Sequence, residues 1–309
     1  MDKNTIVTIA VCTYNRAELL RGCLDSLAGS ENKPVEILII DNNSMDRTEE
    51  VAVEFAKSYP NFDYFTEEKQ GLSHARNRAI AEAKGRYIAY MDDDAKVKED
   101  WVIKSLELIE RNPNVIVFGG MIKPFYQSEK PNWFRDEYEI RTWGEEERFL
   151  EKGEAFSGSN LIIKKEFLTN ELFNIDLGVK SKELKMGEET ELQWKLQDEH
   201  GIGGNFLYSP ALCVYHLVPD YKMKLNYYLK RSIASGQSNY KMKQGDFRKN
   251  ANMAINHSLN IGYRTLKALI RIVKYKSMKQ WALENLVPVM HSLGFVSAFF
   301  GLHYRFKNQ

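Results

Sequence analysis

Cysteine is scarce in this 309-residue chain, and its three cysteines, Cys12, Cys23 and Cys213, have no spacing typical of a metal site. Three isolated thiols argue against a disulfide framework and fit a reduced compartment. The first residues run directly into an apolar strand pattern, without the separate apolar segment of a secretory leader. We therefore expect a cytoplasmic location.

Two phosphate-binding motifs are also missing. No GxGxxG follows the first apolar run, and no GxxxxGK[ST] occurs in the chain. These absences argue against a Rossmann dinucleotide fingerprint and against a P-loop. The acidic triplet Asp92–Asp94 does not fit an EF-hand, because Lys96 and Ile103 would occupy positions five and twelve of the loop.

Acidic residues are nearly absent from the last part of the chain. Residues 221–309 contain 16 Lys/Arg but only Asp246 and Glu284 as acids. Residues 1–220 contain 27 Lys/Arg and 40 Asp/Glu, so the overall net charge of +1 conceals a basic C-terminal region. Such a region is expected to contact an anionic partner. We expect a peripheral membrane contact and no nucleic acid, for which no recognition motif is present.

The basic region has helical patterns and one long apolar stretch. A helix is predicted over Tyr221–Ser235, ending near Gly236. Tyr263–Lys279 is amphipathic and basic, which is typical of an interfacial helix or of a helix packed on protein with a solvated basic face. Leu286–Leu302 has 17 residues without a formal charge, close to the lower limit for a span of about twenty residues. We expect this stretch to lie on a membrane or to pack on protein rather than to cross a bilayer.

Apolar strand patterns alternate with amphipathic helix patterns over the first 118 residues. This alternation predicts an α/β fold with a mostly parallel sheet and helices on both faces. The predicted strands are Ile6–Cys12, Val35–Ile40, Phe62–Phe65, Arg86–Met91 and Val115–Phe118.

Polar residues follow three of these strands directly: Thr13–Arg16, Asp41–Asn43 and the triplet Asp92–Asp94. Ligands bind at the carboxyl ends of strands in open α/β sheets. Adjacent carboxylates repel each other unless a cation offsets their charge, and Mg²⁺ or Mn²⁺ takes such oxygen ligands together with phosphates. Helix capping, an Asx turn or a solvated acidic loop would explain each segment singly. Their joint placement favours a nucleotide pocket.

Six segments occur in order along the chain: VCTYNR (Val11–Arg16), IIDNNSMD (Ile39–Asp46), GLSHARNRAI (Gly71–Ile80), YMDDDAKV (Tyr90–Val97), FSGSNLIIKKEFL (Phe156–Leu168) and GEETELQWKL (Gly187–Leu196). Together they resemble the family 2 glycosyltransferases, which have the Rossmann-like GT-A fold and use nucleotide-activated sugars. The resemblance covers roughly residues 5–220. It implies a catalytic domain over residues 1–220, with a nucleotide-binding half (1–118) and an acceptor half (119–220), followed by a helical extension (221–309).

The resemblance implies a donor site at the strand ends. Asp41 would hydrogen-bond the base, which is usually uracil in the family. Arg76 would approach the diphosphate, and a guanidinium suits phosphate because it donates two parallel hydrogen bonds. A surface arginine on a helix is the alternative. The further donor-site residues would be Thr13, Tyr14, Asn15, Arg16, Asn43, Asp92 and Asp93.

The resemblance also places the family's metal-binding DxD element on the aspartate triplet. Asp94 would be the direct ligand of Mn²⁺ or Mg²⁺. Asp92 would contact the ribose or donor sugar and is a second candidate ligand, while Asp93 has no defined role. His216 would approach the metal or the diphosphate, although a lone histidine beside apolar residues is more often structural.

The catalytic base falls on the segment that begins with Gly187. Relatives usually have Glu-Asp here, with the second acid as the base, so the resemblance assigns the base to Glu189 and leaves Glu188 as the second choice. A helix N-terminus favours an ionised carboxylate, although simple capping also explains glutamates in a first turn. On the acceptor side the resemblance suggests Ser159 and Asn160. Trp133 would either stack on a sugar ring or fill an ordinary core.

These implications describe an inverting glycosyltransferase of the hexosyltransferase type, acting in polysaccharide biosynthesis at the cytoplasmic face of a membrane. Its donor would be a UDP-sugar, and its acceptor a glycan or lipid-linked hydroxyl. One alternative is a sugar-1-phosphate nucleotidyltransferase, which usually needs a glycine-rich basic loop that VCTYNRAELL lacks. The other is a catalytically silent nucleotide- or lipid-binding subunit, against which the intact acidic set argues. No particular oligomeric state is predicted.

Overall fold

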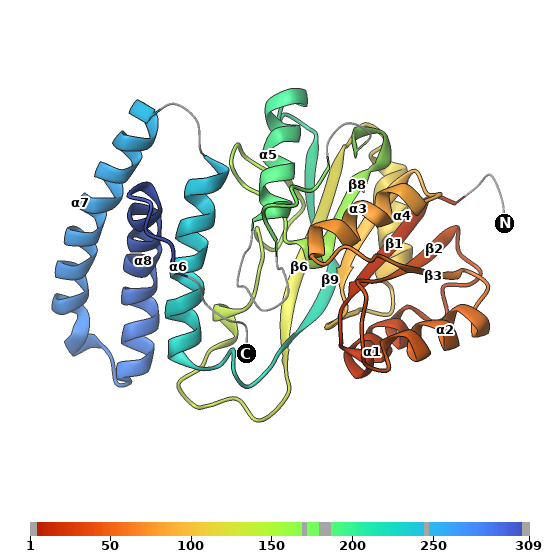
Figure 1. Ribbon diagram of the computed structural model, residues 1–309, viewed down its shortest axis with the longest axis horizontal. Helices are drawn as coiled ribbons and strands as arrows, with labels where there is room; N and C mark the ends of the chain where they lie inside the picture. The colour runs from red at the N-terminus through yellow and green to blue at the C-terminus, as the bar shows by residue number, and fades with distance from the viewer. Residues whose placement is uncertain (1–4, 169–171, 179–186, 244–246, 305–309) are drawn as a thin grey trace. The chain divides into compact units, whose positions relative to one another are not determined.

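The structure is a computed structural model that describes residues 5–168, 172–178, 187–243 and 247–304 (Figure 1). Its strands are β1 (Val7–Thr13), β2 (Val35–Asp41), β3 (Phe62–Thr66), β4 (Tyr87–Asp92), β5 (Ala95–Val97), β6 (Val117–Tyr126), β7 (Arg148–Phe149), β8 (Leu161–Lys164) and β9 (Phe206–Val218). Its α-helices are α1 (Ala17–Leu27), α2 (Thr48–Ser58), α3 (Leu72–Glu82), α4 (Trp101–Arg111), α5 (Glu188–His200), α6 (Leu225–Met242), α7 (Phe247–Arg271) and α8 (Met278–Phe299). Short 3₁₀ helices are η1 (Asp136–Tyr138), η2 (Gly158–Asn160), η3 (Lys165–Leu168) and η4 (Ile272–Lys274).

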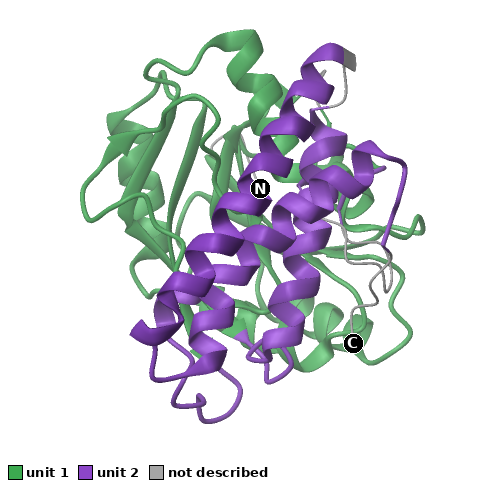
Figure 2. Cartoon of the chain, turned by 90° about the vertical axis from the view of Figure 1, so that its left-hand side faces the viewer, with its two compact units in different colours: residues 1–125, 139–175, 188–217 green, residues 126–138, 176–187, 218–309 purple. Residues whose placement is uncertain are grey.

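The chain forms two compact units (Figure 2). The first comprises residues 1–125, 139–175 and 188–217 and holds the body of the sheet with helices α1–α5. The second comprises residues 126–138, 176–187 and 218–309 and holds helices α6–α8. The domain boundary that we expect at residue 220 stays a prediction.

The described strands form one nine-stranded sheet in the order β3-β2-β1-β4-β8-β6-β9-β5, with β7 paired to β9. β3, β2, β1 and β4 are parallel neighbours, whereas β8 joins β4 in the antiparallel sense. In register, Thr13 lies opposite Asp41, and Cys12 lies opposite Asp92. The polar segments that follow β1, β2 and β4 therefore lie together at the carboxyl ends of the parallel strands, as the sequence predicts.

Helices cover both faces of the sheet (Figure 1). Val7, Ile9 and Val11 of β1 belong to the core beneath α1, α2 and α4, whereas Ala10 and Cys12 belong to the core beneath α3 and α5. Alternate residues of a strand point to opposite faces, so a strand buried on both faces needs a continuous apolar run. The α/β prediction is confirmed.

The second unit contains a close contact between α6 and α8. A Cβ atom at Gly236 would lie 2.0 Å from the carbonyl oxygen of His291, and one at Gly294 would lie 2.1 Å from that of Ile233. The prediction that a helix ends near Gly236 is therefore wrong, because α6 continues to Met242. Here glycine allows two backbones to approach; it does not end the helix.

The predicted Tyr263–Lys279 helix also has different bounds. α7 ends at Arg271, η4 follows, and Ser277 caps the start of α8 by accepting a hydrogen bond from the Gln280 backbone N–H at 3.4 Å. α8 takes up most of the apolar stretch Leu286–Leu302. Among the described residues, no helix is both long and apolar enough to cross a membrane.

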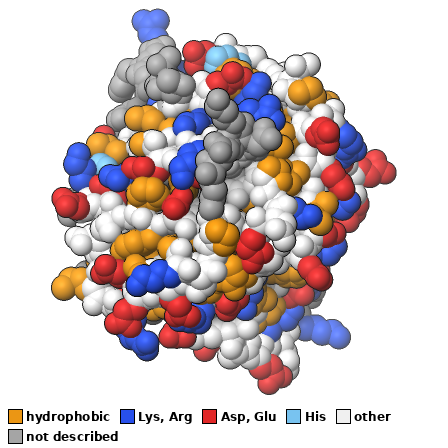
Figure 3. Space-filling model, turned by 90° about the vertical axis from the view of Figure 1, so that its right-hand side faces the viewer, with side chains coloured by type: hydrophobic (Ala, Val, Ile, Leu, Met, Phe, Trp, Pro, Cys, Tyr) orange, Lys and Arg blue, Asp and Glu red, His pale blue; other side chains and the backbone are white. Residues whose placement is uncertain are grey.

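The surface is mixed in charge on the face drawn in Figure 3. Acidic and basic side chains are interspersed there, with apolar side chains between them. A surface of this kind is ordinary for a globular protein. It contrasts with residues 247–279, which contain no acidic residue.

Candidate active site

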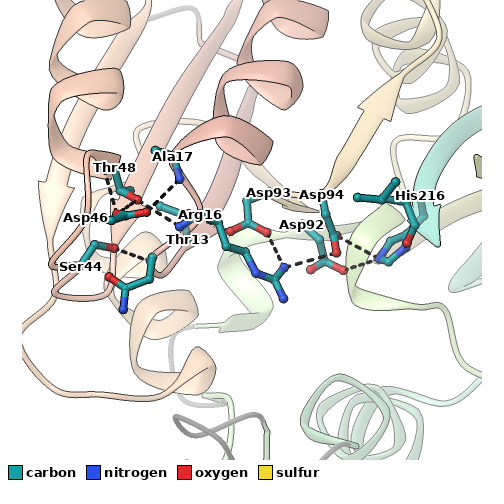
Figure 4. Close-up of polar contacts among 12 residues, drawn as sticks. Thr13, Arg16, Ala17, Ser44, Asp46, Thr48, Asp92, Asp93, Asp94 and His216 are labelled. Carbon is teal, nitrogen blue, oxygen red and sulfur yellow. Dashed lines mark hydrogen bonds and ion pairs between the residues drawn. The ribbon is translucent and has the colours of Figure 1, made fainter. Parts of the chain in front are cut away.

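The acidic triplet begins on the last residue of β4 and ends just before β5. Its middle member points toward β1 (Figure 4). Asp93 accepts hydrogen bonds from the Thr13 hydroxyl at 2.8 Å and from Arg16 Nη1 at 2.9 Å. Burial and the adjacent Asp94 raise the pKa of Asp93 to about 6, against the opposing effect of Arg16. Asp93 thus joins the end of β4 to the end of β1.

The outer two aspartates lie beside His216, although Asp94 Oδ2 is also 3.3 Å from Arg16 Nη1 (Figure 4). His216 Nε2 is 3.3 Å from Asp92 Oδ2 and 3.2 Å from Asp94 Oδ1. One atom from each of the three side chains lies within 4.8 Å of the others. Carboxylate oxygens and an imidazole nitrogen are ligands that Mn²⁺ accepts, so these residues fit a divalent cation.

Strand pairing brings His216 to this position. β9 runs antiparallel to β5, with His216 opposite Ala95, and the Leu217 N–H donates to the Asp94 carbonyl at 2.9 Å. His216 Nδ1 lies 3.1 Å from the Leu217 carbonyl oxygen. A carbonyl can only accept, so Nδ1 carries a proton and Nε2 faces the carboxylates, an arrangement typical of metal-binding histidines.

A buried ion pair lies next to this cluster. Arg76 Nη1 is 2.6 Å from Glu188 Oε1, and Arg76 Nη2 is 3.6 Å from Asp92 Oδ1. The guanidinium also lies over the Phe173 ring at 5.3 Å. Although burial opposes it, the carboxylates of Glu188, Glu189 and Asp92 raise the pKa of Arg76 above its usual value. Arg76 therefore stays charged between the acidic triplet and the start of α5.

The two glutamates at the start of α5 differ in environment. The side chain of Glu188 is 4% exposed, whereas that of Glu189 is 22% exposed. Burial and the nearby Glu189 raise the pKa of Glu188 from 4.5 to about 8, although Arg76 opposes the shift. Glu188 also binds Arg76 directly, with Arg76 Nη1 2.6 Å from its Oε1, and so is less free than Glu189 to meet an incoming hydroxyl. Glu189 is therefore the better candidate for a base.

Glu188 should make the stability of the protein depend on pH. Because its pKa is higher folded than unfolded, the folded state binds the extra proton between about pH 5 and pH 8, and the free energy of unfolding should fall as the pH rises through that window. We expect Glu188→Gln to reduce this slope. Urea unfolding at several pH values measures it. Equal slopes in Glu188→Gln and the native chain would contradict the assignment.

Polar contacts also organise the loops at the carboxyl ends of β1 and β2. The Asp41 carboxylate accepts from the Ser44 N–H at 3.0 Å and from the Tyr64 hydroxyl at 3.2 Å. Asn15 has a positive φ of 52°; its N–H donates to the Ser44 hydroxyl, and its side-chain oxygen accepts from the Met45 N–H at 2.7 Å. These contacts join the segments that follow β1 and β2.

The comparison with known proteins gives the family. The sequence model described as Glycosyl transferase family 2 matches residues 8–168, more than half of the chain. The chain belongs to glycosyl transferase family 2. It is 24% identical over 238 residues to glucosyl-dolichyl phosphate glucuronosyltransferase of Haloferax volcanii, covering 75% of each chain. It is 28% identical over 244 residues to the succinoglycan biosynthesis protein ExoM of Rhizobium meliloti, covering 75% of this chain and 73% of ExoM.

Solved structures confirm the GT-A fold of this glycosyltransferase. The mannosyltransferase PcManGT from Pyrobaculum calidifontis, solved in complex with GDP-Man and Mn²⁺, superposes with a TM-score of 0.63 at 17% identity. The match covers 96% of the present chain and 88% of the PcManGT chain. At this identity the likeness shows the fold alone.

The remaining predicted residues of the glycosyltransferase have varied surroundings. Tyr14 and Asn43 are exposed, and Asn43 has a positive φ of 61°. Asn160 is buried and makes three hydrogen bonds, to Trp101 Nε1 and to the carbonyl oxygens of Met121 and Leu212. Ser159 is fully buried, and its hydroxyl makes no hydrogen bond within the part of the chain that the structure describes. The acceptor-side roles of Ser159 and Asn160 stay predictions.

Trp133, the third residue that we expect on the acceptor side, belongs to the second unit of the glycosyltransferase. Its ring contacts Phe134 edge-on, with centroids 5.5 Å apart, and Lys279 Nζ lies 5.7 Å from its ring centroid. These contacts are typical of an aromatic side chain in a small apolar cluster. The role of Trp133 also stays a prediction.

Three further polar residues of the glycosyltransferase received no individual role from the sequence, although Asn42 lies within the polar segment Asp41–Asn43. Asn42 holds the segment before α3 through hydrogen bonds with the backbone of Glu67, Lys69 and Gly71. Asp46 accepts hydrogen bonds from the Ala17 and Thr48 N–H groups at the starts of α1 and α2. Neither helix begins next to Asp46 in an obvious capping pattern, so the sequence does not indicate this role. These two residues position loops rather than ligands.

Arg141 is the third. It hydrogen-bonds the Ser157 hydroxyl and contributes, with His216 and Arg76, to a pKa of Asp92 well below its usual value even though burial opposes the shift. No sequence motif surrounds it. Its position follows from the pairing of its backbone with Ile122.

Proposed function

We propose that this glycosyltransferase moves a sugar from a UDP-sugar to a hydroxyl of a lipid-linked glycan, with inversion at the anomeric carbon. The observation that carries the proposal is the cluster of Asp92, Asp94 and His216 at the carboxyl end of β4, with Glu189 across the Arg76 guanidinium. A metal-ligand set, a charged arginine and a partly exposed carboxylate at one edge of a parallel sheet suit the displacement of a nucleoside diphosphate.

The metal site would consist of Asp94, Asp92 and His216, with Mn²⁺ or Mg²⁺ as the cation. When bound, a divalent cation neutralises the negative charge that grows on the departing diphosphate. Asp93 would hold the triplet against β1 through Thr13 and Arg16. Arg76 would add a fixed positive charge on the diphosphate side and keep Glu188 in place.

Glu189 would act as the general base. Its carboxylate takes the proton of the acceptor hydroxyl while the oxygen attacks the anomeric carbon from the face opposite the diphosphate. A single in-line displacement of this kind inverts the configuration. Glu189 Oε2 makes no hydrogen bond among the described residues and lies 3.6 Å from Arg76 Nη1, and this positive charge would keep the carboxylate ionised before it takes the proton.

The nucleotide base of the donor and the class of acceptor are proposed from Asp41 and from one relative. Asp41 would receive a hydrogen bond from uracil, since a carboxylate offers about four acceptor sites and Ser44 and Tyr64 use two of them. One relative is named for glucosyl-dolichyl phosphate, a lipid-linked sugar, which supports a lipid-linked acceptor. Residues 221–309 would then supply the contact with the cytoplasmic face of the membrane.

A panel of nucleotide sugars tests the proposed reaction. We expect Mn²⁺-dependent release of nucleoside diphosphate from at least one UDP-sugar, and little release from the GDP-sugars, because Asp41 is expected to pair with uracil. Coupled detection of the released diphosphate measures it. Pyrophosphate production from UTP and a sugar 1-phosphate would instead indicate a nucleotidyltransferase, and turnover of no donor would contradict the proposal.

A further inference from the structure

Helix α7 presents an apolar stripe to solvent. Seven large apolar side chains, six on α7 and Val273 on the following η4, are each 56–85% exposed. At 3.6 residues per turn their positions fall on one side of the helix. The seven are Ile255, Leu259, Tyr263, Leu266, Leu269, Ile270 and Val273. An aliphatic surface of this length is unusual for a protein that only contacts water.

The opposite side of α7 packs within the second unit. Ala254 and Ala268 are buried, and the Trp281 indole of α8 donates to the Ala268 carbonyl at 2.8 Å. α8 packs against both α6 and α7 (Figure 1). α8 therefore uses much of its apolar surface inside the unit, with Val289 and Phe295 buried. The uncharged stretch 286–302 is thus largely accounted for, whereas the stripe on α7 is not.

Charge identifies the partner of the stripe. Residues 247–279 contain eight Lys/Arg and no acid. Lys267 Nζ lies 5.5 Å from the ring centroid of Tyr263 in the stripe, and Arg271 follows four residues later. Packing of this face against the same face of a second copy would bring like charges together, which opposes self-association. An anionic bilayer surface accepts both the apolar side chains and the cations.

We propose that the α7 stripe docks on an anionic phospholipid surface and lies in the plane of its headgroups. The stripe enters the boundary between headgroups and acyl chains, and Lys267 and Arg271 pair with lipid phosphates. The inference rests on the proposed function only in its purpose, which is to bring the active site to a lipid-linked acceptor. The docking itself needs neither donor nor metal.

Vesicle flotation of the full chain tests the docking surface. We expect binding to vesicles of phosphatidylcholine with phosphatidylglycerol, and a loss of ~100-fold or more in the partition coefficient for the Leu259→Asp, Leu266→Asp, Ile270→Asp triple variant. Lys267→Glu with Arg271→Glu should lose ~10-fold on the anionic vesicles and little on pure phosphatidylcholine. Ile103→Asp on α4, which is 41% exposed, is the control and should bind as the native chain does.

The outcomes separate docking from catalysis. The three substituted residues of the triple variant and Ile103 of the control are all exposed. Unchanged thermal melting would show that both variants fold. Equal binding of the triple variant and the native chain would overturn the docking proposal and leave the glycosyltransferase proposal standing. Concentration-dependent dimerisation in sedimentation, abolished by the triple variant, would overturn it in favour of a second copy. Vesicle binding without turnover of any donor would instead count against the proposed function.

Discussion

Glu189→Gln is expected to lower kcat by about 10³-fold while changing the KM of the donor little, since a general base contributes 10²–10⁴-fold. Glutamine keeps the size and hydrogen-bonding capacity of the side chain but cannot take the acceptor proton. Glu189 is partly exposed at the start of α5, so the substitution should not disturb the core. Initial rates of nucleotide release with saturating acceptor measure the effect.

Glu188→Gln is the matched control, because it makes the same chemical change one residue earlier. Glu188 is buried against Arg76, and the amide oxygen of glutamine can still accept the Arg76 hydrogen bond, so most of the activity should remain. If Glu188→Gln abolished turnover while Glu189→Gln did not, the base would be Glu188. Full activity in both variants would show that neither residue is the base.

Asp94→Asn should have the second large effect, through the metal. It exchanges an anionic ligand for a neutral one, and a loss of about 10³-fold in kcat/KM is expected because the cation stabilises the leaving diphosphate. His216→Ala should weaken metal binding in the same direction. Activity measured against Mn²⁺ concentration should show that more metal is required in both variants.

The middle aspartate provides an internal comparison. Asp93 contacts Thr13 and Arg16 rather than His216. Asp93→Asn should therefore lower the free energy of unfolding while changing metal affinity much less than Asp94→Asn does. Equal losses of metal affinity in Asp93→Asn and Asp94→Asn would contradict the separation of their roles.

The sequence predicts the parallel half of the fold well, because burial on both faces leaves a direct mark. The uninterrupted apolar run Ile9–Cys12 is typical of a strand covered on both sides. The bounds of the helices in residues 221–309 are harder to predict from sequence. A glycine such as Gly236 serves a helix end or a close helix contact equally well, and only the tertiary structure decides between them.

The candidate site divides in the same way. Asp92 and Asp94 follow from the strand that precedes them, and His216 follows from the family resemblance. The contact between Arg76 and Glu188 joins residues 112 positions apart and leaves no local pattern. Asp93 could not be separated from its neighbours by sequence, since the turn after β4 decides which way each carboxylate points.

Calorimetric titration of the native chain with UDP, in the presence and absence of Mn²⁺, tests the central claim most directly. We expect Mn²⁺ to strengthen UDP binding at least about tenfold, because a cation held by Asp92, Asp94 and His216 would attract the diphosphate. Asp94→Asn should remove that gain while leaving the metal-free affinity unchanged. Equal UDP affinity with and without Mn²⁺ in the native chain would contradict a metal-dependent donor site.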